Sequence, residues 1–196
     1  THFFDSAGWG MQPDILAARN QDRRAIGEIP LLRDIYRDKA VYVGATLDKL
    51  LKSYVEPMTF SADVVIDGAE HHLTDLTDLI INATAIYAGS WVLDRSGRPD
   101  DGVFELVPMH GRREWISKAI RDHAGVPVWQ EDLDLLGVSH SASHPGRTFD
   151  VTLSRPRGDE HLRSQVDGEE WVSGNVFRVE VEHGALRLIT RADWSP

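Results

Sequence analysis

The sequence contains no cysteine, which excludes disulfide bonds and thiolate metal sites and is compatible with a reducing cytoplasm. No apolar run approaches the roughly 20 residues that span a bilayer, and no signal-peptide pattern opens the chain. Basic residues are also few, since 21 Lys and Arg stand against 31 Asp and Glu, giving a formal net charge of -10. This balance argues against nucleic acid as a partner and against simple electrostatic adhesion to an anionic membrane.

Nucleotide-binding loops are missing as well. No Gly-x4-Gly-Lys-Ser/Thr segment occurs in the chain. Gly8-Trp9-Gly10 begins a Gly-x-Gly pattern, but Pro13 stands where a dinucleotide fingerprint needs its third glycine. The chain also lacks an initiator Met and starts within an apparent strand, so we expect a piece of a longer protein.

What is present favours one mainly β domain with helices. At 196 residues and 41% apolar composition, the chain is long enough for one domain with a sizeable core. Strands are predicted, mostly by period-2 alternation, over His2 to Gly10, Thr59 to Ile66, Thr148 to Arg155, Leu162 to Val166, Phe177 to Glu182 and Ala185 to Thr190. Leu79 to Tyr87 is apolar on both faces, as a central strand would be.

Helical periodicity appears in two stretches. Apolar residues recur at helical spacing between Ile15 and Tyr54, and again from Arg112 to Ala124, where Gly125 ends the pattern. Together with the strands, these helices predict an α+β fold, a two-layer β sandwich of antiparallel strands with attached helices.

Two Asp-Gly turns join predicted strands, one at Asp67-Gly68 and one at Asp167-Gly168. The second is followed by Glu169, whereas Ala69 follows the first. Because Glu169 comes directly after a sharp turn, its carboxylate can point in a fixed direction without being packed in the core. The sequence leaves two interpretations open, a solvated hairpin tip and a placed acid or base.

A second acidic loop runs from Asp94 to Gly102 and leads into another alternating strand. One carboxylate with turn carbonyls is a plausible ligand set for a hard cation such as Mg2+, although such loops are commonly plain turns. The histidines at His71-His72 and at His140 and His144 lack the further ligand that a zinc site needs, so we interpret them as loop residues.

These motifs resemble the bacterial diacylglycerol kinases, a lipid-kinase superfamily that also includes sphingosine and ceramide kinases. The resemblance rests on Val166-Asp167-Gly168-Glu169, the following Phe-x-Val-x-Val and Gly-Ala-Leu-Arg-Leu strings, and Asp100-Asp101-Gly102. It implies that Glu169 is the proton acceptor for the lipid hydroxyl, with Asp167 assisting. It also implies a Mg2+ held by the Asp101 side chain and the carbonyls of Arg98 and Val103.

The resemblance implies a division of labour. In the family, an N-terminal domain with a Gly-Gly-Asp-Gly-Thr loop binds ATP, and no such loop occurs here. Residues 1–196 would therefore be the second, lipid-binding domain of a kinase, inactive without its ATP-binding domain. The implied partner is a lipid substrate met in transient contact with a membrane surface, from the cytoplasm at the inner face. A free-standing lipid or small-ligand binding or interaction module remains the alternative, and the oligomeric state is left open, a homodimer included.

Overall fold

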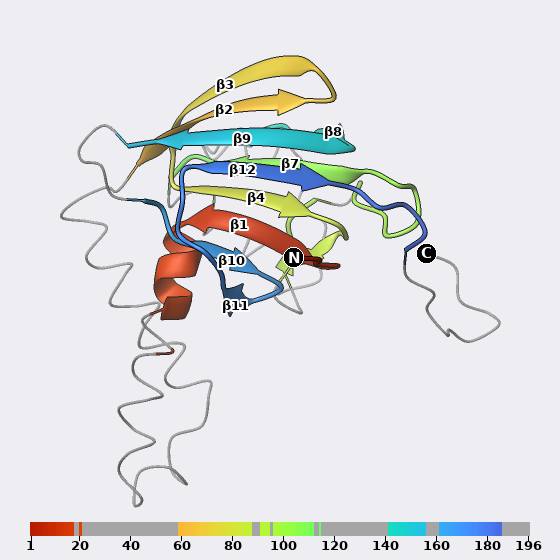
Figure 1. Ribbon diagram of the computed structural model, residues 1–196, viewed down its shortest axis with the longest axis horizontal. Coiled ribbons are helices and arrows are strands. Elements are labelled where there is room, and N and C mark those ends of the chain that lie inside the picture. The colour runs from red at the N-terminus through yellow and green to blue at the C-terminus, as the bar shows by residue number, and fades with distance from the viewer. Residues whose placement is uncertain are drawn as a thin grey trace, which may run out of the picture.

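The computed structural model describes residues 1–17, 20, 59–87, 91–94, 96–111, 114, 141–155 and 161–185. Two antiparallel sheets account for most of these residues (Figure 1). The six-stranded sheet has the order β11 (Glu169–Glu170), β10 (Ser164–Val166), β1 (Ser6–Gly10), β4 (Asp78–Asn82), β7 (Phe104–Met109), β8 (His144–Gly146). The four-stranded sheet has the order β12 (Val176–Glu180), β9 (Thr148–Ser154), β2 (Phe60–Ile66), β3 (Ala69–Leu76). A two-stranded ribbon pairs β5 (Ile86–Tyr87) with β6 (Trp91–Val92).

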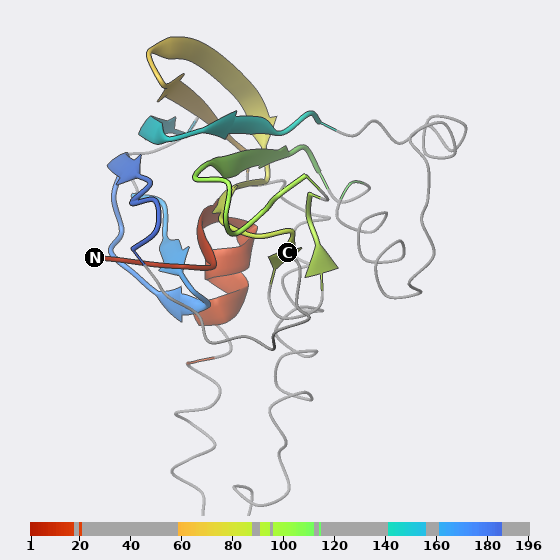
Figure 2. The ribbon, with the colours of Figure 1, turned by 90° about the vertical axis from the view of Figure 1, so that its right-hand side faces the viewer.

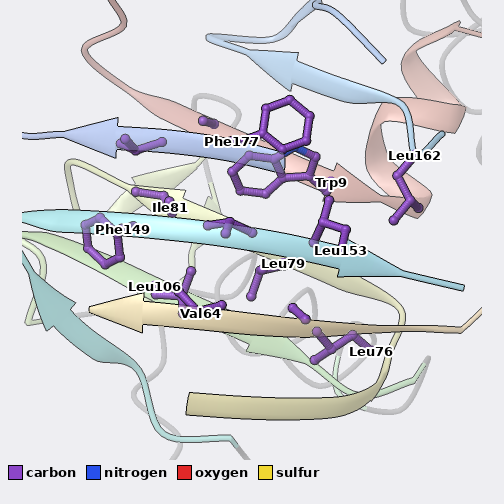
Figure 3. Close-up of a cluster of buried hydrophobic side chains, with 14 of the residues drawn as sticks. Trp9, Val64, Leu76, Leu79, Ile81, Leu106, Phe149, Leu153, Leu162 and Phe177 are labelled. Carbon is purple, nitrogen blue, oxygen red and sulfur yellow. The ribbon is translucent and has the colours of Figure 1, made fainter. Parts of the chain in front are cut away.

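The main core lies between the two sheets. Trp9 of β1 packs against Phe177 of β12, with their ring centroids 5.1 Å apart, and both face the space between the layers (Figure 3). Phe149, Val151 and Leu153 alternate inward along β9, as their period-2 spacing predicts. The two-layer β sandwich expected from the sequence is confirmed.

The other face of the six-stranded sheet, which we call the outer face, is also covered. Ile80, Val107 and Met109 form a second apolar cluster there with Tyr87 and Leu93. A short helix, residues 11–17 with residue 20, lies on this side, away from the four-stranded sheet (Figure 2). With both faces covered, β4 is buried at every position, as predicted for a central strand.

The helix starts directly where β1 ends, and Gly10 makes that junction possible. Gly10 has a φ of +115°, and a Cβ there would approach the Thr77 carbonyl oxygen to 2.3 Å. The buried Asp78 carboxylate accepts a hydrogen bond of 2.8 Å from the backbone N–H of Gln12 and so caps the helix from a neighbouring strand. The Gly-x-Gly pattern in the sequence is thus a strand-to-helix junction.

The observed strands differ from the expected ones at several ends. β1 begins at Ser6 rather than residue 2, and the strand expected from Leu79 to Tyr87 stops at Asn82, then resumes as β5. β3 carries too many polar residues for an alternation to show, and β8 is only three residues long and contains a proline and a glycine, so the sequence predicts neither strand. The helices expected after residue 20 and at residues 112–124, and the last strand at residues 185–190, lie largely outside the described residues.

The two Asp-Gly turns are confirmed and use the same hydrogen bonds. Asp67 and Asp167 have φ values of 48° and 49°, and each is followed by a glycine with positive φ. Asp67 N–H donates to the Thr148 carbonyl, while Thr148 N–H donates to Asp67 Oδ1. Asp167 makes the same reciprocal pair with Ser6. Each turn therefore fixes the start of a strand that is distant in the sequence, β9 for Asp67 and β1 for Asp167.

The Asp67 turn predicts a pH-dependent contribution to stability. Hydrogen bonds from the backbone of Arg147 and Thr148 and from the Thr148 hydroxyl lower the pKa of the Asp67 carboxyl. A lowered pKa means that the stabilisation is present above the unfolded value of 3.8 and is lost as pH falls through the folded value. Asp67→Asn should lower the urea midpoint at pH 7, and the deficit should shrink at pH 3.

Glu169→Gln is the matched control, because it removes one exposed carboxylate charge on β11, which belongs to the other sheet. A deficit for Asp67→Asn that is equal at both pH values would contradict the assignment.

Candidate functional site

Asp167 is a structural clamp at the turn that precedes Glu169. Its carboxylate accepts hydrogen bonds from the backbone N–H groups of Phe4, Asp5 and Ser6, at 3.2, 2.9 and 3.1 Å. On the other side of the turn, the buried Gln165 side chain accepts a hydrogen bond of 2.7 Å from Gly168 N–H. The reversal that carries Glu169 is therefore fixed by side chains on both sides.

A row of buried polar residues crosses the outer face of the six-stranded sheet. Ser6 on β1 lies opposite Asn82 on β4, and Asn82 lies opposite Glu105 on β7. Directly opposed residues of antiparallel strands point to the same face. We call Ser6, Asn82 and Glu105 the polar row; Asp167 contacts it at Ser6, and all three members are at most 3% exposed.

The polar row holds two hydrogen-bond acceptors that lack a donor within the described part of the chain. These are Oδ1 of Asn82 and Oε2 of Glu105. Burial, and after it the nearby charges of Asp94 and Asp101, raise the pKa of the Glu105 carboxyl to about 7. Burial and the charge of Asp167 likewise raise the pKa of Asp5. This end of the sheet is therefore a region of negative potential.

Asp101 belongs to the loop of residues 96–102, which we call the Asp101 loop, and its charge acts on Glu105 of the polar row. Asp101 Oδ1 accepts a 3.1 Å hydrogen bond from Val103 N–H, which leaves Oδ2 for another partner. Arg98 is exposed and pairs with Asp100, Nε to Oδ1, at 3.4 Å. Gly97 packs so closely on residues 84 and 85 that a Cβ would lie 3.0 Å from the Thr84 carbonyl oxygen.

These contacts are compatible with the expected Mg2+ set, one carboxylate and two carbonyls. Across the described ranges, no group of three or more His, Asp or Glu side chains is arranged to hold a metal ion. A site of the expected kind needs only Asp101 as a side-chain ligand, and Mg2+ usually keeps several waters. A buried Glu105 Oε2 without a donor, beside two further carboxylates, is where a cation would lower the free energy. The residues present therefore fit a divalent cation.

Glu169 is exposed on β11, the outermost strand of its sheet. Its register partner is Val166, which packs against the core, so Glu169 is directed to the inner side of this edge. Glu170 is opposite Gln165 and shares the outer face, and its Oε1 accepts a 2.7 Å hydrogen bond from Asn20. Glu169 is thus at the sheet edge, on the other face from the polar row.

The Asp167 turn and the Asp101 loop are linked through the polar row, whose residues the sequence analysis did not identify. Asp167 contacts the polar row at one end and Asp101 acts on it at the other. The available signal was a polar residue within an apolar run, as with Asn82 after Leu-Ile-Ile and Glu105 before Leu-Val. Such residues are costly to bury and so point to a site.

No protein-family model and no curated protein matches the sequence. Among solved structures, the fold is similar to that of a diacylglycerol kinase from Bacillus anthracis str. Sterne, with a TM-score of 0.51 and 14% identity. That match covers 94% of this chain and 50% of that chain. A second structure from the same organism, assigned to the diacylglycerol kinases, gives a TM-score of 0.50 and 14% identity over 93% and 49%.

The chain therefore spans about half the length of the diacylglycerol kinase structures it matches and has the fold of that half. The likeness to this fold, stated from the sequence motifs, is confirmed. The roles of Glu169, Asp167, Asp101, Arg98 and Val103 stay predictions.

The raised pKa of Glu105 yields a test that needs no ligand. An acid whose folded pKa exceeds its unfolded value of 4.5 destabilises the fold progressively as pH rises from that value to about 7. Glu105→Gln removes this penalty, so the variant should gain stability over the native chain as pH rises. One pKa unit corresponds to about 1.4 kcal/mol, so the gain at pH 8 should be ~1–3 kcal/mol after allowance for solvent screening.

Urea denaturation in EDTA at pH 4, 6 and 8 measures this gain. Glu169→Gln, an exposed carboxylate on the same sheet, should show no such growth with pH. A Glu105→Gln gain that is the same at all three pH values would refute the assigned environment.

Proposed function

We propose that this chain is the lipid-substrate domain of an ATP-dependent lipid kinase that phosphorylates the hydroxyl of diacylglycerol or a related lipid. The observation that carries the proposal is the fold likeness, which covers 94% of this chain but only half of a diacylglycerol kinase. The chain itself has no nucleotide-binding loop. ATP would be bound mainly by a separate domain, and this half alone would be inactive.

In this proposal Glu169 is the proton acceptor. Its carboxylate takes the proton of the lipid hydroxyl as that oxygen attacks the γ-phosphorus of ATP. Phosphoryl transfer has a loose transition state, so orientation of the acceptor counts more than its basicity. Exposure of Glu169 in this half is consistent with the role, since a base at a cleft between two domains is uncovered when one domain is viewed alone.

Asp167 acts in this proposal as a positioning residue. Its carboxylate is occupied by three backbone N–H groups at the start of β1, so it is not available to a substrate in the same way. What it fixes is the turn, and through the turn the direction of Glu169. Removing Asp167 should therefore affect both catalysis and the stability of the sheet.

Mg2+ would be held by the Asp101 carboxylate and the carbonyls of Arg98 and Val103, and when bound it would supply positive charge at the acidic end of the sheet. Oδ2 is the Asp101 oxygen that would bind the ion, because Oδ1 already accepts a hydrogen bond from the Val103 N–H. Neutralising Asp101 also relieves its repulsion of Glu105. The chain's own contribution is thus a loop held in shape by its own hydrogen bonds and by the packing of Gly97.

We further propose that the protein works at the cytoplasmic face of the membrane, where its lipid substrate is reached from the aqueous side. No helix among the described residues is long and apolar enough to cross a bilayer. With a net charge of -10, contact with anionic lipid would be transient. The same fold could serve a non-enzymatic lipid-binding module, and the activity assay below separates the two.

The kinase role is tested on the complete reading frame, assayed for phosphate transfer from ATP to diacylglycerol. Glu169→Gln should lower kcat by about 10²- to 10⁴-fold, the usual contribution of a general base. Glu170→Gln is the matched control, since it is the next residue, equally acidic and directed to the opposite face. It should retain most of the activity.

Circular dichroism confirms that both variants fold. Equal activity of Glu169→Gln and the native enzyme removes Glu169 from the role. A folded, lipid-binding protein with no transfer in any form favours the binding module instead.

The cation site predicts a specific stabilisation. Mg2+ at millimolar concentration should raise the melting temperature of the native chain, because a ligand that binds only the folded state stabilises it. Asp101→Asn should abolish the shift, whereas Asp100→Asn, the neighbouring carboxylate that pairs with Arg98, should retain it. Differential scanning fluorimetry measures both, and an undiminished shift in Asp101→Asn places the cation elsewhere.

A further inference from the structure

Gln165 is a buried, uncharged side chain in the middle of β10, and both ends of its amide have a hydrogen-bond partner. Its Oε1 accepts a hydrogen bond of 2.7 Å from Gly168 N–H, and its Nε2 donates one of 3.3 Å to the Ser6 hydroxyl. An amide whose acceptor and donor ends are both occupied is held in one orientation. The Gln165 side chain therefore links the start of β1 to the turn that precedes Glu169.

Gly8 provides the space in which this side chain lies. Gln165 is the register partner of Gly8 on β1, and a methyl group on Gly8 would lie 3.2 Å from Gln165 Nε2. Gly8 is not among the glycines with positive φ, so space rather than backbone conformation accounts for a glycine at this position. A side chain here would press on the amide and weaken its hold on the turn. The first glycine of the Gly-x-Gly pattern is thus explained by its contact with Gln165.

The turn needs such a link because β11 is short and lies at the edge of its sheet. β11 consists of Glu169 and Glu170, which are both exposed, and it is the outermost strand of the six-stranded sheet. Packing in the core therefore does little to hold these two residues. Gly168 N–H belongs to the peptide unit that precedes Glu169, and its hydrogen bond to Gln165 fixes that unit. The direction in which the Glu169 side chain leaves the backbone is thus set from β10.

Gln165 and Asp167 differ in what their hydrogen bonds hold. The Asp167 carboxylate accepts the N–H groups of residues 4–6, so it stabilises the start of β1 as well as the turn. The hydrogen bond from Gly168 to Gln165 lies within the turn itself. Loss of Asp167 therefore disturbs the sheet and the turn together, whereas loss of the Gln165 amide acts chiefly on the turn.

We propose that Gln165 is a positioning residue for the Glu169 carboxylate, which it orients by binding the Gly168 N–H. This rests on the proposed function, in which Glu169 accepts the proton of the lipid hydroxyl. A base that is chemically intact but misplaced by about 1 Å can lose on the order of 10²-fold in rate. Because Gln165 is buried, it acts through Glu169, and its effect falls on kcat rather than on KM.

The test is a double-mutant cycle on the complete reading frame, assayed for phosphate transfer from radiolabelled ATP to diacylglycerol. Gln165→Met keeps the length of the side chain and removes both hydrogen bonds. It is made in the native background and in Glu169→Gln, whose residual turnover the radiolabel makes measurable. Ser164→Ala is the matched control, because Ser164 is the neighbouring buried residue on β10 and its hydroxyl donates to the Val172 carbonyl, beyond the turn.

Gln165→Met should lower kcat by about 10- to 100-fold, with KM for the lipid nearly unchanged. In the Glu169→Gln background the same substitution should lower kcat no further, because a residue that acts through Glu169 then has no base to position. Ser164→Ala should keep most of its kcat, although it too loses a buried hydrogen bond.

An equal loss of kcat in both backgrounds, a rise in KM instead, no loss at all, or a comparable loss in Ser164→Ala overturns the role of Gln165 and leaves Glu169 in its own. Full activity of Glu169→Gln, or no transfer by the native enzyme, overturns the proposed function and this inference with it. Circular dichroism checks that each variant folds. If Gln165→Met does not, Gly8→Ala replaces it in the cycle, since its methyl group presses on the amide, and the same outcomes decide.

Discussion

Two aspartates hold the sandwich together by placing a carboxylate against backbone N–H groups at the start of a distant strand. Asp67 fixes the corner where the chain passes from β8 to β9, and so from one sheet to the other. Asp167 fixes the start of β1, which lies between β10 and β4. Hydrogen bonds to an ionised acceptor are stronger than those between neutral groups, so a carboxylate that accepts two or three backbone N–H groups at once fixes where the strand starts. The hydrogen bonds of Asp167 also fix the turn that precedes Glu169 in the candidate site.

The sequence shows the fold class because the core strands alternate cleanly. Phe149, Val151 and Leu153 face inward at period two, and β4 is apolar on both faces, so strand positions and the two-layer arrangement can be predicted locally. β3 shows no such alternation because it is an edge strand, and side chains such as Glu70 and Asp75 are exposed to solvent rather than packed in a core. Strand order could not be predicted, since β1 pairs with both β4 and β10 through contacts that no local pattern records.

Only part of the candidate site, likewise, could be predicted from the sequence. Turn chemistry makes Asp167-Gly168 and Asp101-Gly102 visible in the sequence, and resemblance supplies the proposed roles of Glu169 and the cation loop. The polar row is invisible there, because Asn82 and Glu105 become neighbours only when β4 and β7 pair. The environment of Glu105 is likewise a tertiary property, since it depends on burial and on two carboxylates from a preceding loop. The sequence shows which residue types are present, but it does not show which of them come together in the folded domain.

The pairing of β1 with β10 also constrains how the protein can be made. Residues as far apart as Asp5 and Asp167, 162 positions along the chain, must meet before the six-stranded sheet closes. On a ribosome β1 emerges well before β10 and has no partner on that side until most of the residues between them have been synthesised. Non-local pairing of this kind slows folding and leaves an apolar strand open to aggregation in the meantime. Biosynthesis of this domain therefore has a long interval in which β1 is unpaired, and chaperone protection of that nascent strand would have the greatest effect on yield.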